Sequence, residues 1–322
     1  MKEEFASSIS AIAASPVHHD IVALGFFDGL IKCCRFGRSE IGKLAFIESW
    51  SHRLKKGVRD FAFSDDGENL YVISENRALA IFNVGEGRLL RCIKRSHAKT
   101  RPHRITSLPE ISRYCAATGG DNGEICQWDF NSAEAMVVTY KDQTASINDL
   151  APFKATTLLA ASGDAKLASY DFRRRKLRVL SETMHTELLS IAILDKCTCV
   201  GSGDGTLEIF NNGEFGNIIG RFKTSHAMGV DAMIELEPHI LLTGGCMSDE
   251  IEFCKIQPNE KLRTMAHAGG ADIFARTCDD KYLIISCTDT NAVYVRRVAD
   301  LARTARQKTH ANNGNNAIFT FD

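Results

Sequence analysis

The densest charged run of the chain is a set of cations whose spacing suits the binding of an anion. Arg173, Arg174, Arg175 and Lys176 are consecutive, and Arg178 follows two positions later. Guanidinium groups pair with phosphate or carboxylate oxygens through parallel hydrogen bonds, so this run predicts a contact with an RNA backbone or an acidic protein. A solvated hairpin turn is the alternative, because charged side chains are mostly exposed in any case.

A second basic cluster lies upstream and is interleaved with two histidines. Its cations are Lys94, Arg95, Lys99, Arg101 and Arg104. The chain as a whole is balanced, with 39 Lys plus Arg against 40 Asp plus Glu and a net charge of −1. Any contact with nucleic acid must therefore use such local patches rather than a field of the whole protein. An accidental grouping of surface charges is the alternative for this cluster.

Two adjacent aromatic residues, Phe26 and Phe27, precede Asp28 in a predicted turn where smaller residues are usual. Exposed aromatic side chains are common anchors at protein interfaces, so both are candidate contacts with a partner. Packing beneath a loop is the alternative.

Histidines and cysteines are the remaining residues able to transfer a proton or bind a metal. Five histidines recur shortly before predicted first strands, tens of residues apart, and this periodic placement predicts a structural role in separate repeats: His52, His97, His185, His226 and His267. The eleven cysteines form no CxxC pair. Several lie in apolar strand patterns, as expected of small buried side chains in a reducing compartment.

No set of catalytic residues is recognisable. The sequence has no GxSxG, no HExxH and no glycine loop that opens a helix, so we expect no enzyme activity, no cofactor, no metal site and no small-molecule substrate. No stretch approaches 18 apolar residues, which predicts no membrane partner. The start, MKEEFASSIS, lacks the basic residues and apolar run of a secretory signal.

The elements that must position these residues repeat seven times. The clearest copies read TGGDNGEICQWDF (118–130), ASGDAKLASYDF (161–172) and GSGDGTLEIFNN (201–212), and weaker copies centre on residues 28, 76, 248 and 289. Each copy predicts two strands joined by a tight turn, in which an Asp or Asn side chain accepts backbone N–H groups. The structural turn residues predicted in this way are Asp28, Asn76, Asn122, Asp164 and Asp204.

Self-similarity at ~40–45 residues is typical of WD40 repeats, with four strands in each blade. The repeat centres are 40 to 48 residues apart, so the chain 1–322 is predicted to be a single all-β, seven-bladed WD40 β-propeller. The seventh repeat supplies only three strands. Its fourth strand must come from residues 2–7 or from AIFTFD (317–322) in the tail 299–322, and the second is favoured because it alternates and is aromatic.

Some segments are more specific than the repeat. SPVHHDIVALGFFDGLIKCCRF (15–36), the RRRKL run and FNNGEFGN (210–217), together with the copies above, resemble the WD repeat-containing protein 55 family and its fungal relatives, from about residue 10 to 297. The resemblance implies a scaffold of the nucleus and nucleolus that acts in ribosomal RNA processing and large-subunit assembly. Its partners would be ribosome assembly factors or pre-ribosomal RNA. The tail is only thinly basic, so a cytoplasmic location stays open.

A substrate receptor of a cullin–RING ubiquitin ligase is the alternative function. Such receptors often end a third strand with W-D-x-R, whose Asp and Arg meet the ligase adaptor. Tyr170-Asp171-Phe172-Arg173 approximates this pattern, whereas Trp128-Asp129 is not followed by the arginine. On this alternative, Asp171 and Arg173 are the candidate contacts with the adaptor.

Overall fold

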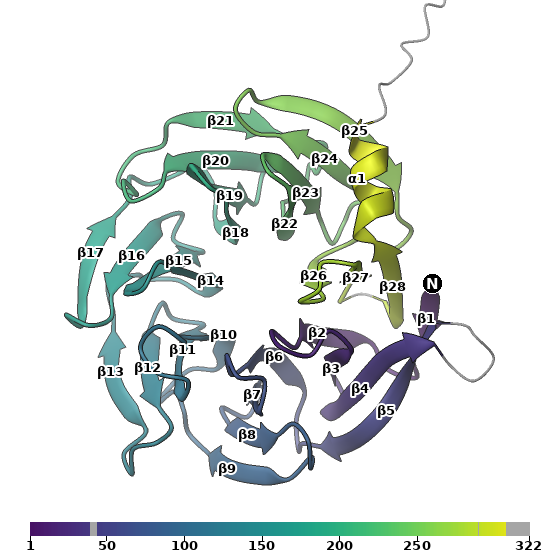
Figure 1. Ribbon diagram of the computed structural model, residues 1–322. Coiled ribbons are helices and arrows are strands. Elements are labelled where there is room, and N and C mark those ends of the chain that lie inside the picture. The colour runs from purple at the N-terminus through teal and green to yellow at the C-terminus, as the bar shows by residue number, and fades with distance from the viewer. Residues whose placement is uncertain (39–43, 289, 307–322) are drawn as a thin grey trace, which may run out of the picture.

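The computed structural model describes residues 1–38, 44–288 and 290–306 of the 322. Within these residues the chain forms seven four-stranded sheets, each an antiparallel blade, arranged in a ring (Figure 1). The prediction of an all-β, seven-bladed WD40 β-propeller is therefore confirmed. The centre of the weak seventh repeat, Asp289, lies outside the described residues.

Each blade runs from an inner first strand to an outer fourth strand (Figure 1). Blade one contains β2 (Ile9–Ala14), β3 (Ile21–Phe26), β4 (Leu30–Arg38) and β5 (Leu44–Arg53). Blade two contains β6 (Val58–Phe63), β7 (Asn69–Ser74), β8 (Leu79–Asn83) and β9 (Leu89–Ile93). Blade three contains β10 (Pro102–Ser107), β11 (Cys115–Gly120), β12 (Ile125–Asp129) and β13 (Met136–Tyr140). Blades four and five contain β14 (Ile147–Phe153), β15 (Thr157–Ser162), β16 (Leu167–Asp171), β17 (Lys176–Leu180); β18 (Leu188–Ile193), β19 (Cys197–Ser202), β20 (Thr206–Asn211) and β21 (Gly220–Lys223). Blade six contains β22 (Ala232–Glu237), β23 (Ile240–Gly244), β24 (Glu250–Lys255) and β25 (Glu260–Ala266).

The burial of the strands follows from their position in the ring. The second strand of blade two, NLYVIS, is buried along its whole length because neighbouring blades cover both of its faces. The outer strand β9, LLRCI, is exposed or half-buried at every position. The core is therefore a series of seams between blades rather than one central cluster.

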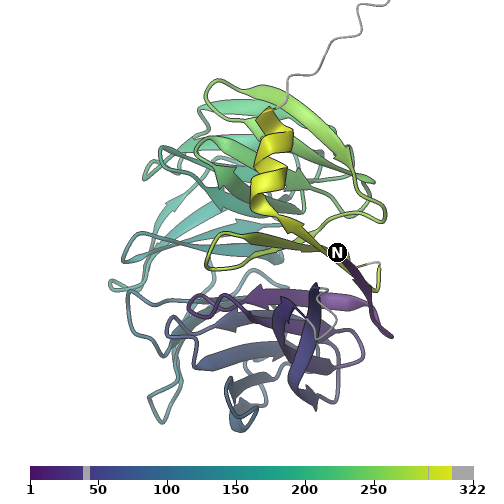
Figure 2. The ribbon, with the colours of Figure 1, turned by 45° about the vertical axis from the view of Figure 1, so that its right-hand side comes forward.

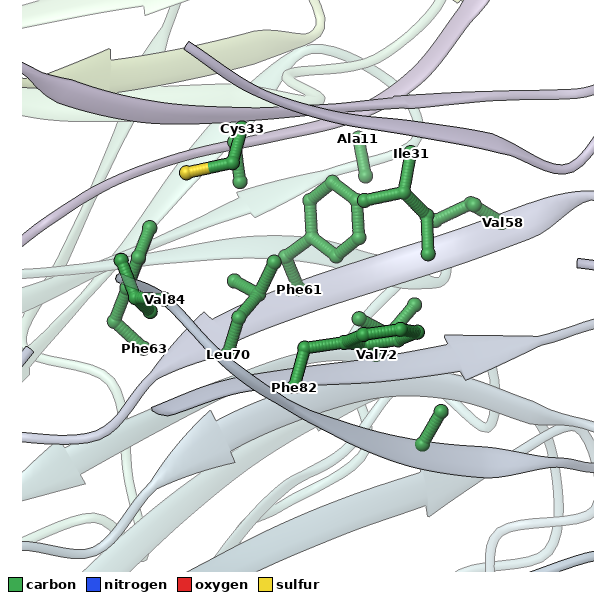
Figure 3. Close-up of a cluster of buried hydrophobic side chains, with 12 residues drawn as sticks. Ala11, Ile31, Cys33, Val58, Phe61, Phe63, Leu70, Val72, Phe82 and Val84 are labelled. Carbon is green, nitrogen blue, oxygen red and sulfur yellow. The ribbon is translucent and has the colours of Figure 1, made fainter. Parts of the chain in front are cut away.

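Figure 3 shows one such seam, between blades one and two. Ala11, Ile31 and Cys33 of blade one pack against Val58, Phe61 and other apolar residues of blade two. Gly25 lies here as well, and a Cβ atom at its position would be 2.6 Å from a methyl carbon of Val58. The close approach of two blades thus requires glycine at the end of β3.

The ring is closed by a strand from the beginning of the chain. Blade seven contains β26 (Ile273–Arg276), β27 (Tyr282–Ser286) and β28 (Ala292–Arg297), and β1 (Lys2–Glu4) pairs antiparallel with β28 as its outer strand. The preference for residues 317–322 as the closing strand is therefore wrong, and that segment lies outside the described residues. The packing of Phe5 explains why β1 is the closing strand. The centroid of its ring lies 5.5 Å from that of Phe26 and 6.4 Å from that of Phe46, which holds β1 against blade one.

The tail begins with a helix that the repeat pattern did not indicate. Helix α1 (Val298–Arg306) follows β28 directly and lies beside blade six (Figure 2). Its apolar positions, Val298, Leu301 and Ala305, join the core of the seam between blades six and seven. Arg306 at its end forms an ion pair with Glu237 at 2.5 Å.

The antiparallel order of the strands gives the ring two distinct faces. Loops between blades, and turns between second and third strands, lie on one side, which we call the crossover face. Turns between first and second strands, and between third and fourth strands, lie on the opposite face. The basic run 173–176 and the basic loop 94–101 therefore lie on opposite faces of the molecule.

Candidate functional site

The five predicted turn residues all make the same local hydrogen bond. In each case one side-chain oxygen accepts a hydrogen bond from the backbone N–H two residues later, at distances from 3.0 to 3.3 Å, as in an Asx turn: Asp28 from Leu30, Asn76 from Ala78, Asn122 from Glu124, Asp164 from Lys166, and Asp204 from Thr206. Each of the five therefore lies in a turn where its side chain accepts a backbone N–H. Ser248 differs, because its hydroxyl donates to the carbonyl of Glu250.

The basic run lies where β16 turns into β17 on the opposite face, as predicted: Arg173, Arg174 and Arg175 are in the turn, and Lys176 is the first residue of β17. The turn is held by Asp171, whose Oδ1 accepts a hydrogen bond of 2.9 Å from the backbone N–H of Arg174. Arg175 has a left-handed φ of 53° at the turn. The side chains of all four basic residues are exposed, and Arg174 forms an ion pair with Asp171 at 4.0 Å.

Two of these four cations, Arg174 and Lys176, line a hollow of about 440 Å³. Arg174, Lys176 and Arg178 surround it together with Asp171, Leu177 and Thr156 of the neighbouring turn. Arg178 donates a hydrogen bond of 3.0 Å to the hydroxyl of Thr157, which orients its guanidinium group along the hollow. Three cations thus face one carboxylate, and that carboxylate is engaged in the turn. The arrangement is suited to holding an anion.

The second basic cluster is divided between two environments. Lys94, Arg95, Lys99 and Arg101 lie in the loop between β9 and β10 on the crossover face, and the side chains are exposed. Arg104 instead lies within β10, so its assignment to this loop is wrong. It faces the central channel, where its Nε donates to the backbone carbonyl of Asn148 at 2.5 Å.

The central channel explains the position of Arg104. Asp60 and Asp149 also line the channel, and each accepts a hydrogen bond from the backbone of the next blade, from Ile105 for Asp60 and from Ile191 for Asp149. Burial raises the pKa of Asp60 to about 6, and the charge of Arg104 opposes that rise. Burial raises the pKa of Asp149 as well, with the same opposition from Arg104. Arg104 therefore balances buried carboxylates and is not available to a surface partner.

The two candidate aromatic anchors also differ. Phe26 is the last residue of β3 and is 1% exposed, within the seam between blades seven and one. It is therefore excluded as an anchor. Phe27 is the first residue of the turn and is 45% exposed on the crossover face, so it remains a candidate.

The periodic histidines have structural surroundings, although not the partners expected in WD40 blades. Buried His97 lies 2.7 Å from Glu124 Oε1 and 2.8 Å from the hydroxyl of Thr118, and Trp128 donates to the same hydroxyl. In the described part of the chain, no histidine ring among these five is hydrogen-bonded to the side chain of a turn Asp or Asn, although the backbone N–H of His267 donates to the carbonyl of Asp249 at 2.7 Å. Among all the described residues, no group of three or more His, Cys, Asp or Glu side chains is arranged to hold a metal ion.

The two candidate contacts with a ligase adaptor, Asp171 and Arg173, differ in exposure. The side chain of Asp171 is 14% exposed and is engaged in its turn, whereas Arg173 is exposed.

No helix in the described residues has the length and apolar character that a membrane crossing requires.

One surface feature was not predicted from the sequence. A groove of about 630 Å³ separates the outer strand β9 of blade two from β12 and β13 of blade three. Its lining includes Ile93, Trp128 and Met136, with Arg95 and Lys141 toward the crossover face. The sequence carries no distinctive signal for this groove: β9 has no aromatic residue, unlike β5 with Trp50 and β13 with Tyr140, but β17 and β25 have none either.

A closed ring of seven four-stranded blades, with an Asx turn between the second and third strands of five of them, defines a WD40 propeller, a class of proteins that generally act as non-catalytic scaffolds. The chain is 30% identical to human WD repeat-containing protein 55 over 267 residues and 31% identical to the rat protein over 264, which covers 82% and 81% of this chain and 67% and 66% of those proteins. The chain belongs to the WD repeat-containing protein 55 family.

A further relative is more distant but matches a longer segment. An uncharacterized WD repeat-containing protein of Schizosaccharomyces pombe is 25% identical over 308 residues, which is 91% of this chain and 83% of that protein. The chain spans about two thirds of the length of the mammalian relatives that it matches. No family model matches the chain.

Proposed function

We propose that this protein is a non-enzymatic scaffold of ribosome biogenesis that acts in the nucleus and nucleolus, in ribosomal RNA processing and large-subunit assembly. Membership of the WD repeat-containing protein 55 family supports the pathway. The hollow beside the turn 173–176 carries the proposal at the level of contacts, because it gathers cations without equal compensation. We propose that it binds the backbone of pre-ribosomal RNA, while other surfaces bind ribosome assembly factors.

The chemistry of the hollow favours phosphate. Arg174 and Arg178 present planar guanidinium groups, which match phosphate oxygens in pairs, and Lys176 adds a compact charge. Because the net charge of the chain is −1, attraction of RNA depends on this local density and is screened within ~8 Å at physiological salt. Contacts to phosphate fix the position of a protein on RNA without reading its sequence.

The ligase alternative predicts different partners. Recovery of the tagged protein under native conditions, followed by mass spectrometry, should yield assembly factors and large-subunit proteins. Recovery of a ligase adaptor and a cullin, abolished in an Asp171→Ala variant, would favour the ligase function instead.

The first prediction concerns the basic turn. Changing residues 173–176 to four serines should weaken association with RNA and reduce the slope of log affinity against log salt by roughly one for each phosphate that the protein no longer touches. Stability should change little, because these side chains are exposed and contribute no core area. Binding of labelled pre-ribosomal RNA across a salt series measures both quantities.

The matched control removes four exposed cations that are scattered over other parts of the ring, namely Lys55, Lys56, Lys196 and Arg297. It changes the net charge by the same amount but leaves the hollow intact, so its affinity should stay close to that of the unmodified protein. Equal losses of affinity in the two variants would reduce the turn to a solvated hairpin.

A further inference from the structure

The groove between blades two and three has features of a binding site that the proposed function does not use. We propose that it binds an extended segment of a partner protein in which an apolar side chain is followed or preceded by acidic residues. The groove lies on the circumference of the ring, and its volume of about 630 Å³ is within the range of about 300–1,000 Å³ that is usual for binding pockets.

The groove exists because the outer strand of blade two has no side chain large enough to fill it. Ile93 of β9 pairs with the first residue of β8, and Tyr140 holds the corresponding position in blade three. Tyr140 fills its own seam, with its ring 4.9 Å from that of Tyr170. Ile93 is shorter, and a groove remains beside it, whose lining includes Trp128 and Cys126 although each is only 2% exposed.

The same space in the seam between blades one and two is occupied by aromatic rings from β5. Trp50 stacks on Phe82 at 5.7 Å, and the ring of His52 lies 5.0 Å from Phe82. The groove beside β9 therefore lies between two seams that are filled. An apolar side chain from a partner would complete its packing as Trp50 and Tyr140 do in theirs.

One apolar residue of the lining reaches the surface, and the strand beside it has a free edge. Met136 at the start of β13 lines the groove and is 53% exposed. Within the described residues β9 pairs only with β8, so its outer edge keeps backbone groups able to receive an added strand. An extended segment can thus use both the apolar floor and the strand edge.

The charges of the groove decide which segment fits. Arg95 and Lys141 lie at the end toward the crossover face, and Lys94 and Lys99 are close in sequence in the same exposed loop. In the part of the chain that the structure describes, none of these four forms an ion pair. Charge complementarity at such a rim steers association and selects acidic partners.

The lining also contains acids and one further arginine, none of which reverses this balance. Glu124 is 7% exposed and is engaged with His97 and Thr100, so its charge is internal. Arg91 donates to three carbonyls of the loop 130–135, and Glu134 lies in that loop at the far end of the groove. The partner is therefore expected to place its apolar residue over Trp128 and its acids toward Arg95 and Lys141.

Selection from a library of displayed random peptides on the immobilised full chain tests the proposal. The selected peptides should share an aliphatic or aromatic residue with at least two acidic residues within about three positions. A parallel selection on an Ile93→Tyr variant, in which the new ring fills the groove as Tyr140 fills its seam, should not enrich them. The absence of a shared pattern, or the same peptides from both proteins, would overturn the proposal.

The affinity of one selected, fluorescently labelled peptide then measures the two contributions separately. Ile93→Tyr should weaken binding at least tenfold, and Arg95→Glu with Lys141→Glu should also weaken it roughly tenfold at physiological salt. The matched control, Lys55→Glu with Lys56→Glu, reverses two exposed charges on the same face outside the groove and should bind as the unmodified protein does. Thermal unfolding of each variant reports whether it is folded.

Single-stranded RNA provides the last arm of the test. If a uridine 20-mer binds these cations and displaces the peptide, and Ile93→Tyr leaves both affinities unchanged, the cluster is an RNA contact and the proposal is wrong. The four-serine variant of the turn 173–176 should bind the peptide normally, which separates this site from the proposed function.

Discussion

Single turn residues carry a measurable part of the stability of each blade. Asp204 accepts hydrogen bonds from the backbone of Thr206 at 3.0 Å and from the hydroxyl of Ser202 at 2.7 Å. Asp204→Ala should lower the free energy of unfolding by about 1–2 kcal/mol, because the amide of Thr206 loses its acceptor and the Ser202 hydroxyl keeps only the carbonyl of Thr206. Chemical denaturation measures the change. Asp204→Asn keeps one acceptor oxygen and should lose less stability, and equal decreases in the two variants would show that the charge matters rather than the turn.

A buried histidine makes stability depend on pH. His267 is 2% exposed and packs edge-on against Tyr294, and burial, aided by the charge of Arg296, lowers its pKa to about 4. The unfolded chain binds a proton near pH 6.5 and the folded chain does not, so stability falls as pH decreases from about 6.5 toward 4. At pH 5 this group should cost about 1–2 kcal/mol relative to pH 7.

The corresponding prediction is that His267→Phe removes this contribution while keeping the ring contact. Urea unfolding at pH 7 and pH 5 should show a smaller difference for the variant than for the unmodified protein. His18→Phe, at an exposed position, is the control. An unchanged difference in the variant would show that His267 takes up its proton over the same pH range in the folded and unfolded states.

At the scale of elements, the closing strand is the part that a variant can test. Met1 exchanges backbone hydrogen bonds with Val295 of β28, and the amide of Phe5 donates to the carbonyl of Asn291, so by alternation the amide of Glu3 also points into the ladder. Glu3→Pro removes that donor and should lower the free energy of unfolding by about 1–3 kcal/mol. Glu3→Ala keeps the amide and removes only the carboxylate. Thermal unfolding compares them, and identical melting temperatures would mean that β1 does not hold the ring closed.

The sequence predicted the repeated elements, which depend on local residue types, better than the features that depend on contacts between distant parts of the chain. Turn chemistry is local, so the Asx turns at Asn76 and Asp204 could be located from residue types alone. The choice between β1 and residues 317–322 as closing strand depended on where Phe5 packs, which no local pattern contains. Helix α1 had a visible signal, since Val298, Leu301, Ala302 and Ala305 follow a helical period.

The same distinction applies to the candidate site. The turn 173–176 could be placed because a charged run between two strands has few other positions. Whether Phe26 or Phe27 is exposed depended on the residue at which β3 ends. The position of Arg104 in the central channel depended on carboxylates from blades two and four, which are distant in sequence. The groove beside β9 depended on the size of Ile93 relative to side chains of other blades.

At the scale of the whole molecule, the two candidate surfaces are separated by the ring itself. The hollow of blade four opens on the opposite face, and the groove between blades two and three ends toward the crossover face. Their positions suit a scaffold that holds RNA and a protein segment at the same time. Neither surface needs the other to move, because each is built on the edges of rigid blades.

The pairing of β1 with β28 sets an order of events during synthesis. The residues of β1 leave the ribosome about 290 positions before those of β28. At roughly 5–20 residues per second, β1 waits on the order of 15–60 s without a partner. During that time six blades are able to stack while the first blade keeps one side bare, so the nascent chain carries an open arc rather than a ring. Chaperones that bind unpaired strand edges are therefore expected to bind β1 and the bare side of the first blade in the nascent chain.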